Sequence, residues 1–254
     1  MKTYNGYLID LDGTVYNGTE KIDEAVDFVR ALNQHNIPYL FLTNNSTKHP
    51  RDVAKKLQSM DIEATEAQVL TTSMATAKYV SKRHPGARVY AIGEEGLIMA
   101  LEAEGLIMTA DAPDYVVMGL DREITYEKLA TGALAIRNGA QFVATNGDIK
   151  LPSEHGFLPG AGSLISVLSV TTETEPTFIG KPEPIMVEQA LEVLDMTKAE
   201  TLIVGDNYYT DILAGINAGI DSLLVYTGVT KNEDLVQVKQ LPTYTIQSLN
   251  DWNF

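Results

Sequence analysis

The residues Tyr7-Leu8-Ile9-Asp10-Leu11-Asp12-Gly13-Thr14 give the clearest indication of the fold. A short apolar run leads directly into two aspartates and a glycine, which is the pattern of a buried strand that ends in a polar turn. Similar short runs recur at residues 39–42, 89–92, 115–118, 142–144, 202–204 and 223–226. Amphipathic helical patterns lie between them, as in residues 25–32, 129–136 and 185–194. This alternation predicts right-handed strand–helix–strand units and an α/β fold with a doubly wound parallel sheet.

A second domain is expected within the first. Arg83-His84-Pro85-Gly86 is a cluster of helix-breaking residues, and residues 171–176 form a polar, linker-like run. The segment between these two stretches has strand and helix patterns of its own. We therefore expect an inserted α/β domain of roughly ninety residues, within the range typical of a domain.

Composition excludes several classes of protein. The 254 residues include 19 Lys+Arg and 34 Asp+Glu, for a net charge of −15. This charge disfavours binding to nucleic acid polymers or anionic membranes, although one bound cation and one lysine could still attract a small anionic substrate. There is no cysteine, which excludes thiolate metal sites, disulfides and a cysteine nucleophile. With neither an 18-residue apolar run nor a signal-peptide core, we expect a cytoplasmic protein.

Polar side chains follow the ends of several predicted strands or precede a helix. They are Asp10 and Asp12, Thr43 and Asn44, Lys181, and Asp206 with Asp211. Ligands of open α/β sheets bind beyond the carboxyl ends of the strands, so neighbouring strands would bring these groups into one pocket. Taken singly, each motif also has a purely structural interpretation, as a turn, a helix cap or a surface lysine.

The residue types suit the chemistry of a phosphoester, whose negative charge resists attack by another anion unless a metal neutralises it. Asp10 and Asp206 could supply the oxygen ligands that Mg²⁺ prefers. Lys181 and the Thr43 hydroxyl could hold the remaining phosphoryl oxygens. Asp10 would then act as the nucleophile that forms an aspartyl phosphate, and Asp12 as the acid and base.

The motifs Asp-x-Asp-Gly-Thr, Thr-Asn, Lys-Pro and Gly-Asp-x-x-x-Thr-Asp, in this order, resemble those of the haloacid-dehalogenase (HAD) superfamily of phosphatases. Residues 42–45, 144–148, 156–162 and 180–182 are similar to the NagD-like branch, which includes 4-nitrophenyl-phosphatases, phosphoglycolate phosphatases and pyridoxal phosphatases. The resemblance implies an HAD-like Rossmannoid core at residues 1–82 and 178–254. It also implies an inserted α/β cap of the C2 type at residues 83–177.

The resemblance also implies a role for each motif residue. Asp10 would be the nucleophile and Asp12 the acid and base. Mg²⁺ would be held by the Asp10 carboxylate, the Asp12 backbone carbonyl and Asp206. Asp211 would orient the metal-bound waters or the lysine. Three groups would bind the phosphoryl group: the Thr43 hydroxyl, the backbone of Asn44 and Lys181.

The loop Asn146-Gly147-Asp148 of the expected cap differs from the Asn-Pro-Asp of some relatives. We expect Asn146 and Asp148 to face the substrate, with a simple capped turn as the alternative. Glycine loosens such a loop, so the substrate of any one relative is not transferred to this chain. His155 is the one histidine whose place in the cap loop could bring it near a substrate.

The leading hypothesis is a magnesium-dependent phosphomonoesterase for small phosphorylated metabolites, with 4-nitrophenyl phosphate as an artificial substrate. Sugar phosphates, nucleoside monophosphates, phosphoglycolate and pyridoxal phosphate all stay open, and a homodimer is a further expectation. One alternative is a phosphotransferase or mutase of the same fold, which shares the first half-reaction. Another is a receiver-type signalling module that accepts phosphate without hydrolysing it, although a receiver is much shorter and needs neither an acid such as Asp12 nor a cap.

Overall fold

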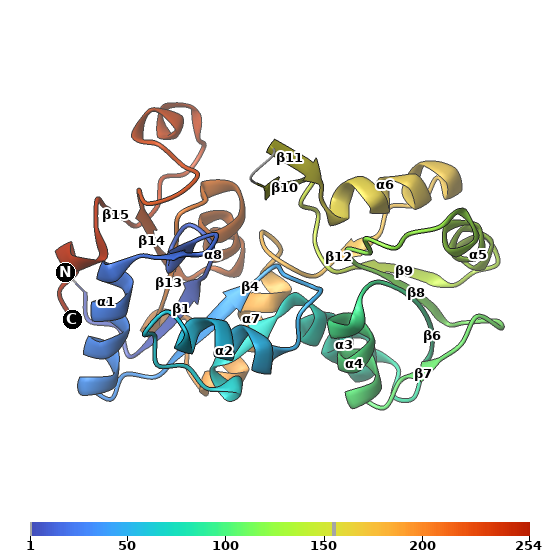
Figure 1. Ribbon diagram of the computed structural model, residues 1–254, viewed down its shortest axis with the longest axis horizontal. Helices are drawn as coiled ribbons and strands as arrows, with labels where there is room; N and C mark the ends of the chain where they lie inside the picture. Colours follow the sequence, from blue (N-terminus) through green and yellow to red (C-terminus); the bar gives the residue numbers. More distant parts are fainter. Residues whose placement is uncertain (1, 154–155) are drawn as a thin grey trace. The chain divides into compact units, whose positions relative to one another are not determined.

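A computed structural model describes residues 2–153 and 156–254 (Figure 1). His155 therefore lies outside the described residues. The chain forms two compact units. Unit 1 comprises the chain through Thr43 together with Pro50–Leu70 and Lys181–Phe254, and unit 2 comprises Asn44–His49 and Thr71–Gly180. Among the described residues, no helix has both the length and the apolar character needed to cross a membrane.

Unit 1 is built around a six-stranded sheet in the order β15-β14-β13-β1-β4-β5. The strands are β1 (Gly6–Asp10), β4 (Tyr39–Thr43), β5 (Val69–Thr71), β13 (Thr201–Gly205), β14 (Asp221–Val225) and β15 (Tyr244–Ile246). The pairs from β15 through to β4 are parallel. The helices are α1 (Asp23–Gln34), α2 (Pro50–Gln58), α7 (Pro184–Leu194) and α8 (Leu213–Ala218), the last preceded by a π-helical turn at Tyr208–Ile212. Shorter elements are the hairpin β2 (Tyr16–Asn17) and β3 (Glu20–Lys21), and the 3-10 turns Glu66–Gln68, Lys198–Glu200, Asn232–Gln237 and Leu249–Asp251.

Strand β1 occupies the middle of this sheet because both of its faces are apolar. Tyr7, Leu8 and Ile9 are all buried. Tyr7 and Ile9 pack in one core with side chains of α1 and α2, while α7 contacts β1 and β4 and packs on α8. In the register of the sheet, Asp10 lies opposite Leu42 and Ile9 opposite Val204. The residues that follow these strands therefore meet at one edge of the sheet.

Unit 2 has its own parallel sheet, in the order β12-β9-β8-β6-β7. The strands are β6 (Arg88–Ile92), β7 (Ile107–Met108), β8 (Tyr115–Met118), β9 (Gln141–Ala144) and β12 (Thr177–Phe178). The helices are α3 (Thr72–Arg83), α4 (Glu95–Ala103), α5 (Tyr126–Arg137) and α6 (Ala161–Thr172), and β10 (Lys150–Ser153) pairs with β11 (Gly156–Pro159) in a hairpin. Helices α3 and α4 pack together, as do α5 and α6. The prediction of an α/β fold with parallel sheets is confirmed.

The structure groups helix α3 and residues 44–49 with unit 2, whereas the sequence pattern suggested a boundary near Arg83. The reason is local packing: α3 lies against α4, and the Ser73 hydroxyl donates to the carbonyl of Ser46 at 2.8 Å. The N–H of Gly96 likewise donates to the carbonyl of Thr47. The boundaries of a cap domain at residues 83 and 177 stay a prediction.

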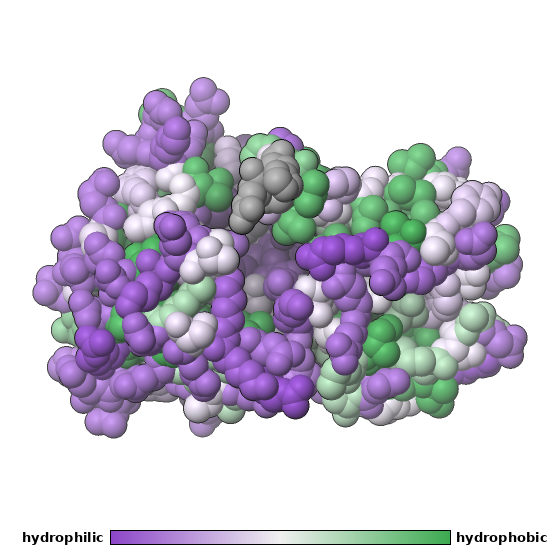
Figure 2. Space-filling model, in the orientation of Figure 1, coloured by the Kyte–Doolittle hydropathy of each residue, from purple (hydrophilic) through white to green (hydrophobic). Residues whose placement is uncertain are grey.

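Apolar side chains lie on the surface of helix α6 in unit 2. Val167 and Val170 are exposed on this helix, and Leu134 is exposed on α5. Figure 2 shows green, hydrophobic atoms gathered where α6 lies in this view, whereas the surface of unit 1 is mostly purple. The homodimer expected from the sequence stays a prediction.

Candidate active site

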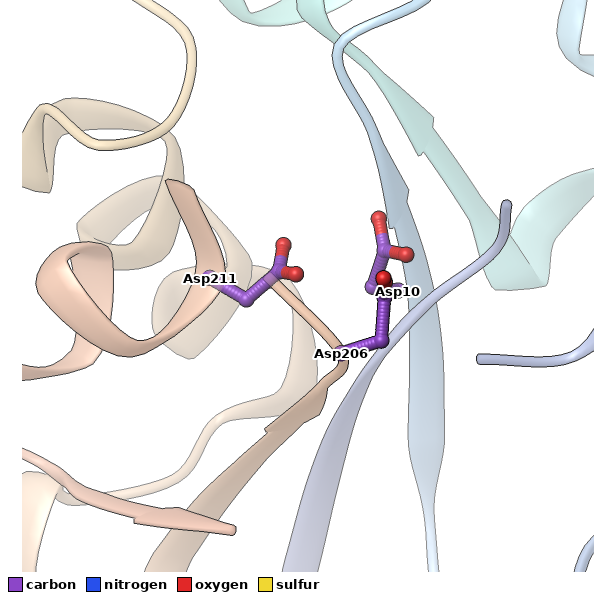
Figure 3. Close-up of side chains that lie close together, drawn as sticks. All are labelled: Asp10, Asp206 and Asp211. Carbon is purple, nitrogen blue, oxygen red and sulfur yellow. The ribbon is translucent and has the colours of Figure 1, made fainter. Parts of the chain in front are cut away.

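Three aspartates of unit 1 come together at the carboxyl edge of its sheet (Figure 3). Asp10 ends β1, Asp206 directly follows β13, and Asp211 lies in the π-helical turn Tyr208–Ile212. One carboxylate oxygen of each lies within 4.8 Å of the others, and Asp206 and Asp211 are both buried. Such a group of oxygen ligands could hold a metal ion.

Lys181 is the positive partner of this cluster. Its Nζ lies 2.5 Å from Asp10 Oδ1 and 2.7 Å from Asp211 Oδ1, and it also donates to the carbonyl of Leu42 at 3.2 Å. Burial alone would lower the pKa of Lys181, but the carboxylates of Asp10 and Asp211 raise it above its ordinary value. The ammonium therefore stays charged at neutral pH and all three of its protons have an acceptor.

The negative charge of the cluster exceeds what one lysine compensates. Burial raises the pKa of Asp10 well above its ordinary value, the charge of Asp211 raises it further, and Lys181 opposes the shift. Burial and Asp211 likewise raise the pKa of Asp206 to about 6, against the hydrogen bond from the N–H of Val229. Both raised pKa values show that the cluster holds more negative than positive charge. A bound cation would stabilise the charged carboxylates.

Close backbone contacts hold the Asp206 carboxylate in place. Its Oδ2 accepts the N–H of Val229 at 2.6 Å. A Cβ atom on Gly228 would lie 2.0 Å from the same oxygen, and one on Gly13, whose φ is +96°, would lie 2.4 Å from it. A glycine is therefore needed at both positions, because any side chain would push the carboxylate away.

The hydroxyl of Thr14 lies between Asp10 and Asp206, and Thr14 was not among the predicted site residues. Thr14 is fully buried, and its Oγ1 lies 3.3 Å from both Asp10 Oδ2 and Asp206 Oδ1. A hydroxyl has one proton and so donates to only one of the two carboxylates at a time. The position of Thr14 at the end of the Asp-x-Asp-Gly-Thr motif could have indicated this contact.

Asp12 lies on the exposed side of the same loop. Its Oδ1 accepts the N–H of Gly18 at 3.3 Å, and its backbone pairs with that of Tyr16. Lys56 of α2 places Nζ 3.6 Å from the centroid of the buried Tyr16 ring. Burial lowers the pKa of Lys56, and the charge of Asp12 opposes this shift. No sequence signal singled out Lys56, because one lysine on an amphipathic helix has the pattern of a surface residue.

The other predicted site residues divide between the two units. Thr43 ends β4 in unit 1 and is buried. Asn44, Asn146 and Asp148 belong to unit 2 and contact one another: Asn44 Nδ2 donates to Asp148 Oδ2 at 3.1 Å, and Asn146 Nδ2 donates to the Asn44 carbonyl at 2.8 Å. Their contact with a substrate stays a prediction.

Comparison with known families gives two matches along the chain. A family described as haloacid dehalogenase-like hydrolase matches residues 7–107, and one described as HAD-hydrolase-like matches residues 178–252. The chain is 60% identical to the 5'-nucleotidase YutF of Bacillus subtilis over 252 residues, which cover 99% of this chain and 98% of that protein. It is 52% identical to an acid sugar phosphatase of Staphylococcus saprophyticus, covering 99% of this chain and 97% of that protein.

Solved structures agree with this relationship. A single-mutant thermostable NPPase from Geobacillus stearothermophilus is 56% identical, with a TM-score of 0.95 and full coverage of both chains. A 4-nitrophenylphosphatase from Thermotoga maritima is 34% identical, with a TM-score of 0.92, covering 97% of this chain and 95% of that one. The resemblance to the NagD-like branch and the prediction of a phosphatase are thereby confirmed. The chain belongs to the haloacid dehalogenase-like hydrolase family.

Proposed function

We propose that this protein hydrolyses small phosphomonoesters with the help of Mg²⁺ and through an aspartyl phosphate on Asp10. The proposal rests on the cluster of Asp10 with the buried Asp206 and Asp211 at the carboxyl edge of the parallel sheet, where Lys181 pairs with Asp10 and Asp211. A buried excess of carboxylate oxygens beside one fixed ammonium suits a divalent cation together with a phosphoryl group.

The donor set fits magnesium, because its atoms are all hard oxygen ligands. Asp10 and Asp206 would hold the ion through their carboxylates, and Asp12 through its backbone carbonyl. When bound, Mg²⁺ neutralises the charge of the phosphoryl oxygens. Gly13 and Gly228 support this arrangement, since they leave room for the Asp206 carboxylate where the N–H of Val229 holds it.

Asp10 acts as the nucleophile. One of its carboxylate oxygens attacks phosphorus, which forms an acyl–phosphate bond as the bond to the leaving oxygen breaks. Asp12 gives a proton to the leaving oxygen. The same carboxylate of Asp12 then takes a proton from water, and this water attacks phosphorus to release phosphate and regenerate Asp10.

Three groups hold the phosphoryl group during both steps: the Thr43 hydroxyl, the Asn44 N–H and the Lys181 ammonium. Asp211 orients the lysine. Both of its oxygens are engaged, Oδ1 by Lys181 at 2.7 Å and Oδ2 by the N–H of Asn207 at 3.1 Å. The fixed carboxylate thus keeps the ammonium in place when Asp10 turns to attack.

Unit 2 is proposed to act as the cap that selects the leaving group. The names of the relatives suggest two substrate classes, nucleoside monophosphates and sugar phosphates. Because Asn146-Gly147-Asp148 departs from the Asn-Pro-Asp of some NagD-like proteins, both classes belong in the test.

The direct test is release of inorganic phosphate from a panel of sugar phosphates, nucleoside monophosphates and 4-nitrophenyl phosphate. With Mg²⁺ present we expect release from at least one ester, and with excess chelator we expect the rate to fall at least about 100-fold, since charge neutralisation by the metal is worth several kcal/mol. Added Mg²⁺ should restore the rate. Equal rates with and without chelator would contradict the role of the metal, and transfer of phosphate only to a second sugar would favour a phosphotransferase.

A further inference from the structure

Asn44, Asn146 and Asp148 form a hydrogen-bonded set within unit 2, here called the Asn44 clasp. Asn44 is held at two points. Its side chain donates from Nδ2 to Asp148 Oδ2 at 3.1 Å, and its main-chain carbonyl accepts from Asn146 Nδ2 at 2.8 Å. The two partners come from the loop that follows β9, about 100 residues further along the chain. This loop therefore fixes both the Cβ atom and the carbonyl carbon of Asn44.

Fixing these two atoms also fixes the position of the Asn44 nitrogen. The Cα atom is tetrahedral, so the directions of Cβ and of the carbonyl carbon determine the direction of the nitrogen. The direction of its N–H depends in addition on the other end of the peptide, Thr43, which terminates β4. This nitrogen belongs to the peptide that joins Asn44 to Thr43, and its N–H is the group assigned above to the phosphoryl oxygen. The inference rests on that proposed function.

The clasp is itself anchored in the core of unit 2. Thr145 is fully buried, and its carbonyl accepts the Thr72 hydroxyl at 2.6 Å and the N–H of Gly180 at 2.7 Å. Gly180 also closes the space beside Asn44, because a Cβ atom at that position would lie 2.6 Å from Asn44 Oδ1. The Asn44 carboxamide is therefore confined as well as hydrogen-bonded.

The polar atoms of Asn146 are engaged within the protein. Nδ2 donates to the Asn44 carbonyl and lies 3.3 Å from Thr145 Oγ1, and Oδ1 accepts the N–H of Asp148 at 3.1 Å. The side chain is 3% exposed. Both polar ends of the Asn146 side chain therefore have partners within unit 2.

We infer that Asn146 and Asp148 are positioning residues, which hold in place the backbone amide of Asn44 that the proposed function assigns to the phosphoryl group. Their effect passes through a group that every substrate shares. It is therefore the same for all phosphomonoesters, whatever the leaving group. A residue that recognises the leaving group would act on some esters and not on others.

The experiment uses the full chain with Mg²⁺ and compares Asp148→Ala, Asp148→Asn and Asn44→Ala with the double variant Asn44→Ala/Asp148→Ala. Two esters with different leaving groups serve as substrates, a sugar phosphate and 4-nitrophenyl phosphate. Binding of inorganic phosphate, which has no leaving group, is measured by calorimetry. Ile149→Ala is the matched control, because its side chain is 61% exposed in the same loop.

For Asp148→Ala we expect kcat/KM to fall by about 10–100-fold, the scale known for losing the hydrogen-bond partner of a metal-ligating side chain. The factor should be the same for both esters, and phosphate should bind more weakly. Asp148→Asn should recover most of the activity, because its Oδ1 can still accept from Asn44 Nδ2. The double variant should be no worse than the more damaging single variant.

A loss confined to one ester, with phosphate binding unchanged, would overturn the inference and place Asp148 against the leaving group. Additive effects in the double variant would also overturn it. If the wild-type protein releases no phosphate from any ester, the proposed function fails, and the calorimetric comparison still tests the clasp. Circular dichroism of each variant shows whether the fold is kept, and Asp148→Asn preserves the test if Asp148→Ala does not fold.

Discussion

Replacing Asp10 by asparagine is expected to lower kcat by at least about 10⁴-fold, the scale seen when a nucleophile is removed from a hydrolase. An amide has nearly the same shape as a carboxylate but cannot form the acyl phosphate. Phosphate release under saturating Mg²⁺ and substrate measures the effect. Asp61→Asn is the matched control, because this aspartate is exposed and pairs only with Lys21 among the ion pairs seen in the described part of the chain.

The same variant should fold at least as stably as the wild type when the metal is removed. The pKa of Asp10 is raised in the folded state, chiefly by burial and then by Asp211, so its charged form opposes folding at neutral pH. Asparagine removes this charge, and Lys181 keeps Asp211 as its partner. Thermal unfolding in chelator measures the difference. Retained activity in Asp10→Asn would contradict the assignment of the nucleophile, and a collapsed Tm would show that the loss of activity reports folding instead.

Replacing Lys181 by methionine is expected to cost both activity and stability. The lysine is 2% exposed between two carboxylates, and removing one partner of a buried ion pair costs about 3–5 kcal/mol. Phosphate release should fall to background, because no other ammonium takes this place among the described contacts of Asp10. Denaturant unfolding and the phosphate assay measure the two losses separately.

The stability lost in Lys181→Met should depend on pH. A carboxyl group whose pKa is raised by folding opposes folding above that pKa and ceases to do so once it is protonated. Burial and Asp211 already raise the pKa of Asp206 to about 6, and the pKa of Asp10 is raised further when Lys181 no longer opposes the shift. The deficit should therefore be largest above pH 6 and shrink as the pH falls toward 4. A deficit independent of pH would point to lost packing instead of charge.

A second substitution separates the two roles of the lysine. In Lys181→Met/Asp211→Asn, the buried carboxylate left without its ammonium becomes a neutral amide. Stability should largely return, because this removes the repulsion between Asp211 and Asp10. Activity should not return, since the positive charge for the phosphoryl group is still missing. Recovery of both would contradict a direct role of Lys181 in phosphate binding.

Much of the fold could be predicted because the central strands are buried on both faces. Tyr7, Leu8 and Ile9 form a continuous apolar run, as expected of a strand covered on two sides, and the other apolar runs likewise fall in strands. Strands of two residues, such as Ile107–Met108 and Thr177–Phe178, are too short to show any periodicity. The grouping of α3 with α4 depends on packing between helices, which the amphipathic pattern of one helix does not reveal.

The acidic residues of the candidate site could be found because each lies at a strand end or within a few residues after one, where an open α/β sheet binds its ligands. The contacts that support these acids could not be found from the sequence. The hydroxyl of Thr14 and the backbone N–H of Val229 approach Asp206 from distant parts of the chain. The contact of Asn44 with Asp148 likewise spans 104 residues and leaves no local pattern. Such contacts depend on three-dimensional distances, which spacing along the sequence does not fix.

A covalent phosphoryl intermediate on Asp10 can be detected by trapping the enzyme with borohydride during turnover. This reagent reduces an aspartyl phosphate to the alcohol homoserine and leaves a free carboxylate unchanged. Peptide mass spectrometry should then find homoserine at position 10 when substrate and Mg²⁺ are both present, and aspartate there when either is omitted. Homoserine in place of another aspartate, or an unmodified Asp10 in enzyme that is releasing phosphate, would contradict the assignment of Asp10 as the nucleophile.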